Sequence, residues 1–201
     1  MKKLLLLFAL FSYQSTAQKP IVFKEVWVWE YTDEDGQKQE MAIYHLPSKN
    51  YWLFTPESYG SSGEMISYIL AKPNGEYTFA FQNEHRKKLD LQTVKLNFLA
   101  PKPLPPIGQK TKTFGDTFLG FPLITGKEHK GPGGSTIYLA PTKSSLLPIL
   151  YFNSLEGDAK IPVHFPVTLP GNIIPLEEVE NGQVKYTFKF KSNTEYWVYQ
   201  Y

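Results

Sequence analysis

The sequence predicts a mainly β protein: an antiparallel curved sheet that forms an incomplete barrel or a sandwich, with at most short helices. Three observations lead to this prediction. Apolar and polar residues alternate with a period of two along most of the 201 residues, which is typical of half-buried strands. Asp-Gly and Asn-Gly pairs, which favour tight hairpins, separate several of these runs. Segments with the periodicity of a helix are scarce.

The N-terminus has the three-part layout of a bacterial secretory signal. Lys2 and Lys3 precede an apolar run at 4–11, and small residues at 15–17 precede Gln18. This apolar run is too short to span a bilayer, and no later segment is long enough to do so. We therefore expect residues 1–17 to be a signal peptide and residues 18–201 to be a single soluble β-rich domain, exported to the periplasm or the extracellular space. The chain has no cysteine, which excludes lipid anchoring through an N-terminal Cys.

The first predicted strand, residues 22–31, places Phe23, Trp27, Trp29 and Tyr31 on one face. Residues 77–82 and 185–191 alternate in the same way. Between Leu89 and Phe98 the apolar residues change phase, and one extra residue near Gln92 and Thr93 would explain the change as a β-bulge. Hairpin turns are predicted at three pairs of residues: Asp35-Gly36, Asn74-Gly75 and Asn181-Gly182.

Helices and prolines complete the predicted organisation. Residues 56–59 and 142–147 favour one or two turns of helix each. The prolines at 162, 166 and 170 are spaced by four, so their missing N–H donors point the same way, which predicts an extended segment at a sheet edge. The proline-rich residues 100–107 join two candidate halves of the domain, residues 18–99 and 108–201.

Composition excludes several classes of function. The chain carries 21 Lys+Arg against 19 Asp+Glu, and removal of Lys2 and Lys3 with the signal leaves 19 against 19. A neutral chain does not attract polyanions, so nucleic acid is not an expected partner. Arg86 is the single arginine, which disfavours a phosphate-reading site. The absence of cysteine rules out thiol catalysis, zinc-thiolate sites and disulfides.

No motif in the sequence identifies a catalytic residue, a metal site or a cofactor. The acidic residues 33–36 lie where a turn is expected and lack the closing Glu of a calcium loop. The glycine-rich residues 131–134 lack the ending of a phosphate-binding loop, and residues 60–63 miss the serine-hydrolase elbow by one position. The histidines at 45, 85, 129 and 164 show no ligand spacing.

Aromatic side chains are the main candidates for a binding surface, since they make up 15% of the chain. Six of them fall on alternating positions of predicted strands, and they form either the lining of a ligand cavity or an ordinary core. They are Trp27, Trp29, Trp52, Tyr77, Phe79 and Phe81.

The secretory signal, the single β-rich domain, the tryptophan-rich first strand and residues 69–77 together resemble exported envelope proteins of the LolA-like periplasmic lipoprotein-carrier type, or related families of unknown function. This resemblance implies a strongly curved, incomplete antiparallel barrel whose concave apolar face holds acyl chains.

Three classes of function follow from these observations. The first is a noncatalytic envelope protein that binds a hydrophobic small molecule or lipid in a β cavity. The alternative is a structural or protein-interaction module that binds an envelope partner. An envelope hydrolase and a small outer-membrane barrel rank below both. The alternating aromatics at 197–201 favour the last of these, but Asn193 and Glu195 fall on its lipid-facing positions.

Overall fold

The computed structural model describes residues 19–59, 66–83, 88–117, 120–155 and 159–199. Its eleven strands form one antiparallel sheet that is not closed. The predicted curved antiparallel sheet with short helices is therefore confirmed, and a two-sheet sandwich is not formed. The strands are β1 (Ile21–Thr32), β2 (Lys38–Leu46), β3 (Tyr51–Phe54), β4 (Ile66–Ala71), β5 (Glu76–Asn83), β6 (Lys88–Lys95), β7 (Pro106–Phe114), β8 (Ile124–Lys130), β9 (Thr136–Pro141), β10 (Ile173–Glu180) and β11 (Gln183–Val198).

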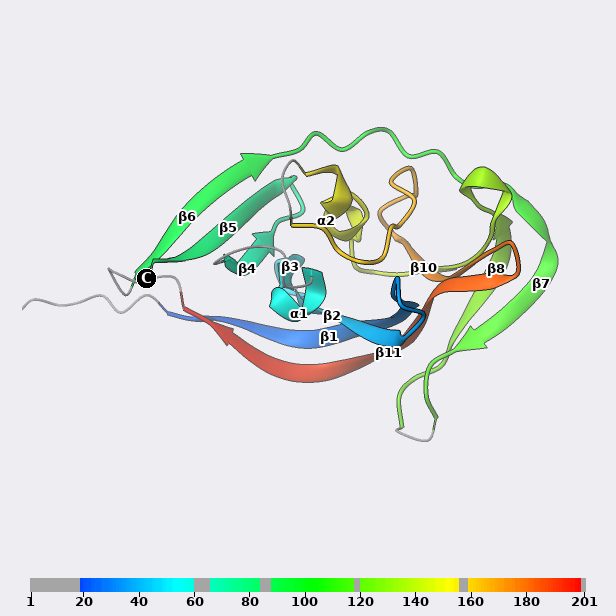
Figure 1. Cartoon of the computed structure of the whole chain (residues 1–201), viewed down its shortest axis with the longest axis horizontal. Helices are drawn as coiled ribbons and strands as arrows, with labels where there is room; N and C mark the ends of the chain where they lie inside the picture. Colours follow the sequence, from blue (N-terminus) through cyan, green and yellow to red (C-terminus); the bar gives the residue numbers. More distant parts are fainter. Residues whose placement is uncertain (1–18, 60–65, 84–87, 118–119, 156–158, 200–201) are drawn as a thin grey trace, which may run out of the picture.

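The sheet consists of two meanders joined through the first and last strands. Its order is β6-β5-β4-β3-β2-β1-β11-β10-β9-β8-β7, so every neighbour except β1 and β11 is also a neighbour in sequence. The two edges of the sheet, β6 and β7, are connected by residues 96–105, which we call the linker. Figure 1 shows the sheet curving round and the linker running across the opening between its two edge strands.

Alternation along the strands produces a core on each face of the sheet. Trp52 and Phe54 belong to the large core cluster, whereas Leu53 between them belongs to a second, smaller cluster. Ile69 and Leu70 divide in the same way. Because successive side chains of a strand point to opposite faces, the two clusters lie on opposite sides of the sheet.

The large cluster lies on the face that encloses residues 142–155 and 159–172, which we call the covering segment. This segment contains the short helices α2 (Leu147–Leu150) and η2 (Phe152–Ser154), and it places Leu146, Phe165 and Leu169 in the large cluster. In Figure 1, α2 and the chain that follows it lie inside the curve of the sheet. Two other short helices are present, α1 (Pro56–Tyr59) and η1 (Pro132–Gly134).

The three predicted hairpin turns are confirmed. Asp35-Gly36 connects β1 to β2, Asn74-Gly75 connects β4 to β5, and Asn181-Gly182 connects β10 to β11. Asn181 and Gly182 both have positive φ, at 52° and 80°, as a two-residue hairpin of matching twist requires.

The first strand differs from its predicted pattern at one aromatic residue. Trp27 and Trp29 lie in the large cluster and Tyr31 packs against it, but Phe23 belongs to the smaller cluster. The pairing of β1 with β11 shifts between Phe23 and Glu25, so the simple alternation does not extend to the start of the strand.

Three other local predictions are wrong. The bulge expected at Gln92 and Thr93 is absent, because β6 pairs with β5 in one continuous register. The apolar residues between Leu89 and Phe98 change phase because Leu89 packs against the smaller cluster and Leu96 against the large one. The helix predicted at 142–147 starts only at Leu147. The segment with prolines at 162, 166 and 170 is not an edge strand but part of the covering segment, where Val163, Phe165 and Leu169 are buried.

The predicted signal peptide, residues 1–17, lies outside the described residues, as do residues 60–63 and His85 and Arg86. Within the part of the chain that the structure describes, no helix is long and apolar enough to cross a membrane. The proline-rich residues 100–107 form the end of the linker and the first two residues of β7, at the transition from the first meander to the second.

Candidate functional site

The structure brings the six predicted aromatic residues to the enclosed face of the sheet. Trp27, Trp29, Trp52 and Tyr77 are at most 2% exposed, and Phe79 is 8% exposed. Phe81 is half-buried and packs against the same cluster. The rings contact one another directly, with 5.3 Å between the ring centres of Trp27 and Trp52 and 6.3 Å between those of Phe79 and Phe81.

The covering segment lies directly on this aromatic surface. The Tyr77 hydroxyl donates a hydrogen bond of 2.8 Å to the Pro148 carbonyl, and the ring of Phe152 lies 4.1 Å from that of Phe54. Trp29 packs edge-on against Phe165. The tryptophans and Tyr77 are therefore covered by the protein's own chain.

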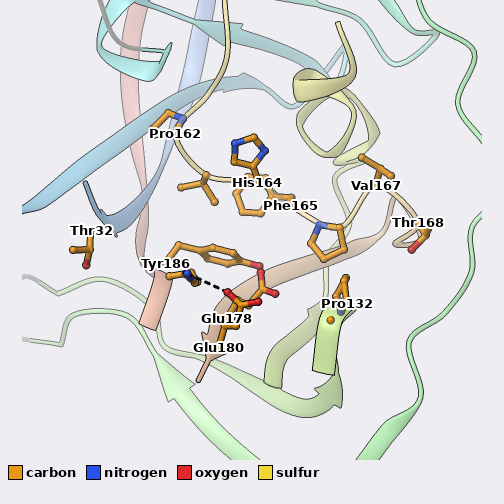
Figure 2. Close-up of a pocket in the computed structure, with 14 residues that line it drawn as sticks. Thr32, Pro132, Pro162, His164, Phe165, Val167, Thr168, Glu178, Glu180 and Tyr186 are labelled. Carbon is orange, nitrogen blue, oxygen red and sulfur yellow. Dashed lines mark ion pairs between the residues drawn. The ribbon is translucent and has the colours of Figure 1, made fainter. Parts of the chain in front are cut away.

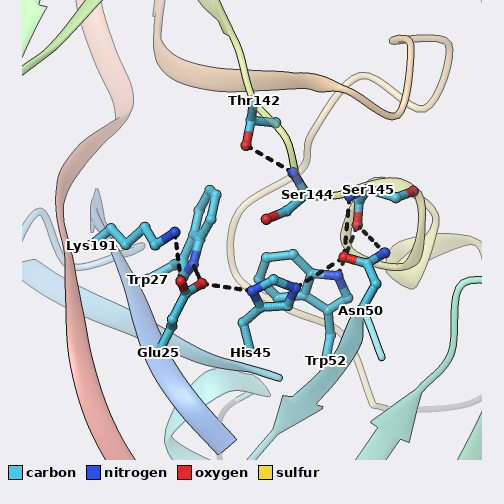
Figure 3. Close-up of polar contacts among 9 residues, drawn as sticks. All are labelled: Glu25, Trp27, His45, Asn50, Trp52, Thr142, Ser144, Ser145 and Lys191. Carbon is cyan, nitrogen blue, oxygen red and sulfur yellow. Dashed lines mark hydrogen bonds and ion pairs between the residues drawn. The ribbon is translucent and has the colours of Figure 1, made fainter. Parts of the chain in front are cut away.

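A polar cluster ties the start of the covering segment to the first meander (Figure 3). We call it the polar clasp, and it consists of Glu25, His45, Asn50 and Ser145. Asn50 binds the Ser145 backbone twice: its Nδ2 donates to the carbonyl at 3.1 Å, and its Oδ1 accepts from the N–H at 3.2 Å. The indole N–H of Trp52 donates to the same carbonyl at 2.9 Å.

His45 is 1% exposed, and both of its ring nitrogens face acceptors. Nδ1 lies 2.7 Å from the Glu25 carboxylate, and Nε2 lies 3.0 Å from Asn50 Oδ1. The bonds to Ser145 fix which end of the Asn50 amide faces the histidine, so we assign both imidazole nitrogens as donors. His45 is thus held by a hydrogen bond at each ring nitrogen and stacks on Trp52 with 4.0 Å between ring centres.

Glu25 is the negative centre of the clasp. Besides His45, it accepts a hydrogen bond from the Trp27 indole at 3.2 Å and pairs with Lys191 at 2.8 Å. Burial acts to raise the pKa of Glu25, but the hydrogen bonds from His45, Lys191 and Trp27 outweigh it and hold the pKa below its ordinary value. The clasp is therefore a charged structural joint, and every member has a partner within the protein.

An apolar pocket of about 340 Å³ lies where the linker crosses the second meander; we call it the linker pocket. Its walls come from the linker, from β8 and β9, and from the end of the covering segment with the start of β10. It is lined by Pro103, Leu104, Thr125, Lys127, His129, Leu139, Ala140, Pro141, Leu169, Pro170 and Ile173.

The sequence builds this pocket through alternation in β8 and through proline in the segments around it. Thr125, Lys127 and His129 alternate along β8 and share one face. The linker is attached at separate points: His129 Nδ1 donates to the Leu104 carbonyl at 3.0 Å, and the Lys130 N–H donates to Pro105 at 3.0 Å. Prolines have no N–H to donate, so the linker cannot pair along its whole length and leaves a space beneath it.

A larger groove of about 710 Å³ opens beside the β10–β11 hairpin (Figure 2). Glu178, Glu180, Lys185 and Tyr186 line it from the sheet, and His164 lines it from the covering segment. Burial raises the pKa of Glu178 despite a hydrogen bond of 2.7 Å from the Ser135 hydroxyl. We call this opening the acidic groove.

The acidic groove does not have the geometry of a glycosidase. Glu178 and Glu180 project from the same strand two residues apart, not from opposite walls of a cleft. Glu180 is paired with Lys185 at 3.1 Å. Across the described residues, no three His, Asp or Glu side chains lie close enough together to hold a metal ion. Asp33, in the acidic turn, binds the backbone and side chain of its own hairpin at Gln37 and Gln39.

Sequence reasoning did not identify the linker pocket. The alternation of Thr125, Lys127 and His129 indicates a strand, and it places polar side chains together on one face of that strand. The apolar lining comes from distant segments, so no local pattern joins Leu104 to Leu139 or Ile173. The clasp was also missed: its turn at Lys49 and Asn50 contains no glycine, and Asn50 itself takes the positive φ, at 52°.

Comparison with known proteins found no family model, no curated protein and no solved structure that matches this chain. The function is therefore argued from the geometry of these sites alone.

Proposed function

We propose that the protein is a noncatalytic carrier that binds a hydrophobic small molecule or lipid in the linker pocket. One observation supports this most: of the eleven residues that line the pocket, eight are apolar. Small-molecule sites are typically concave and mostly apolar, with a few polar groups that orient the ligand. The volume of about 340 Å³ lies at the lower end of the usual range of 300–1,000 Å³.

The linker supplies a cover that can open for the ligand. Apart from its contacts with β8, it is held near the pocket by the Lys102 N–H, which donates to Thr168 at 2.7 Å. Its first residues are fixed more firmly, by the Leu96 N–H bond to Gly75 and by the packing of Leu96 and Phe98 against the large cluster. Opening near the pocket therefore breaks few hydrogen bonds, each of which is exchanged for one to water at little cost, and exposes Leu104. A ligand longer than the pocket enters by displacing the linker, while the sheet beneath stays intact.

In this proposal the six aromatic residues support the site and do not line it. None of Trp27, Trp29, Trp52, Tyr77, Phe79 and Phe81 lines the linker pocket. They hold the covering segment, which carries Leu169 and Pro170 to the pocket wall. Export by the N-terminal signal and work in the bacterial envelope belong to the same proposal, as does the resemblance to LolA-like carriers.

A protein-interaction module is the second candidate, and the exposed edge of the sheet favours it. β6 is the last strand of the sheet, and its Leu91 and Val94 are 45% and 43% exposed. An open edge can pair with a strand of a partner chain. In this case, the protein should form dimers or larger assemblies as its concentration rises.

Native mass spectrometry of the protein purified without detergent, followed by solvent extraction, tests both candidates. The carrier predicts a monomer with a stoichiometric adduct that extracts into organic solvent. The interaction module predicts a bare mass that doubles at higher concentration. A bare monomer at every concentration, together with no binding of an added apolar probe, contradicts the carrier.

A further inference from the structure

We infer that the ligand of the linker pocket is an anionic amphiphile, an apolar chain that ends in a carboxylate or a similar acidic group. This inference rests on the proposed function and specifies the chemistry of its ligand. It follows from the charges that line the linker pocket and the acidic groove.

The linker pocket contains basic groups and no acid. Lys127 and His129 are the ionisable side chains among its lining residues. Lys127 is solvent-exposed, and no described residue forms an ion pair with it. A lysine at the rim of an apolar pocket that lacks a counterion is suited to a ligand that brings one.

His129 adds a second polar group at the same wall. Its Nδ1 donates to the Leu104 carbonyl, which fixes the ring; Nε2 of the neutral imidazole is then an acceptor, so Lys127 supplies the positive charge for the ligand. His129 and Lys127 are two residues apart on one face of β8, so both side chains reach the same end of the pocket. Leu139, which pairs with Lys127 across the strands, continues the apolar wall beneath them.

The acidic groove has the opposite character, which separates the two openings by charge. Glu178, Glu180 and Lys185 line it, and Glu178 is half-buried. A carboxylate ligand placed there finds Lys185 already paired with Glu180, so the groove supplies no free counterion for it. An anionic amphiphile therefore has one favourable opening of the two.

A competition experiment tests the inference. N-phenyl-1-naphthylamine, a neutral apolar fluorescent probe, is displaced by decanoate or by 1-decanol, which have the same chain length and differ in charge. A charge-assisted hydrogen bond contributes about 1.5 kcal/mol or more, so we expect decanoate to compete about tenfold more strongly than decanol at neutral pH and low salt. High salt should reduce this preference, because the lysine is exposed.

Two lysine variants test whether Lys127 carries the charge that causes the preference for decanoate. Lys127→Met should abolish the preference for decanoate over decanol. Lys110→Met is the matched control, since Lys110 is an exposed lysine of β7 that does not line the pocket. Equal competition by decanoate and decanol, or a preference that survives Lys127→Met, overturns the inference and leaves the carrier proposal standing. If neither the probe nor the two competitors bind, the carrier proposal itself fails.

Discussion

At the scale of single residues, the polar clasp shows how a β protein without disulfides fastens a long internal segment. Glu25 and His45 are brought together by the pairing of β1 with β2, where they are direct partners. Asn50 then carries the connection across to Ser145, 95 positions away in the chain. The largely buried Glu25 carboxylate is tolerated because it accepts hydrogen bonds from His45, Lys191 and Trp27.

The clasp predicts a specific dependence of stability on pH. Because the pKa of Glu25 is lowered on folding, its carboxylate stabilises the fold above the ordinary value of 4.5, and this contribution is lost as the pH falls through the lower, folded value. Glu25→Gln should reduce the free energy of unfolding by about 2–3 kcal/mol at neutral pH. Urea unfolding should show the difference from the wild type shrinking as the pH drops below 4.5.

The matched control for this prediction is Glu195→Gln. Glu195 pairs with Lys24, and both side chains are at least 50% exposed. Its loss should cost less than about 1 kcal/mol. A destabilisation by Glu25→Gln that is the same at all pH values, or no larger than that of Glu195→Gln, contradicts the charged clasp.

At the scale of elements, the hairpin turns hold the register of the meanders, and one of them also anchors the linker. Gly75 has φ of +84°, and its carbonyl accepts a hydrogen bond of 2.8 Å from the Leu96 N–H at the start of the linker. A Cβ added at Gly75 would lie 2.2 Å from the Leu96 carbonyl oxygen. The turn is thus closed to any larger residue by its contact with the linker.

A comparison of Gly75→Ala with Gly36→Ala separates the energetic cost of backbone strain from the cost of disturbing this contact. Both glycines have positive φ, but a Cβ at Gly36 meets nothing within 4 Å. We expect Gly36→Ala to cost about 1 kcal/mol of unfolding free energy from strain alone. Gly75→Ala should cost about 1–3 kcal/mol more, because the linker must move. Chemical denaturation measures both variants, and equal losses would show that the contact has no energetic role.

The same elements show what could be predicted from the sequence. Hairpins such as Asn181-Gly182 are local: the residues that need positive φ are adjacent, so the pattern is sufficient. The position of Phe23 was not predictable, since it depends on a shift in pairing with a strand at the other end of the chain. The covering segment was mistaken for an edge strand because its proline spacing is compatible with both structures.

At the scale of the whole molecule, the candidate site arises from contacts that no local pattern encodes. Tyr77 and Pro148 are 71 residues apart, and Trp29 and Pro175 are 146 apart, yet their hydrogen bonds set the space within the sheet. Alternation predicted that the six aromatic residues would gather on one face. The path of the linker and the covering segment determines which residues cover these aromatic side chains and where an opening is left.

The described part of the protein is a curved sheet filled mainly by its own chain, with an apolar opening under the linker. The linker pocket adjoins the large core cluster, since Leu139, Ala140 and Leu169 belong to both. A ligand bound there would extend the core, because its apolar surface would be transferred from water into contact with the protein. The central claim is that apolar ligands bind at this place and at no other described opening.

The most direct test of that claim is a titration with N-phenyl-1-naphthylamine of the wild type and of two tryptophan variants. Thr125→Trp fills the linker pocket from an exposed strand position, and Val184→Trp places the same side chain on β11, where residue 184 does not line the pocket. The account predicts saturable binding by the wild type and by Val184→Trp, and binding at least about tenfold weaker by Thr125→Trp. Equal affinity of all three proteins for the probe would contradict it.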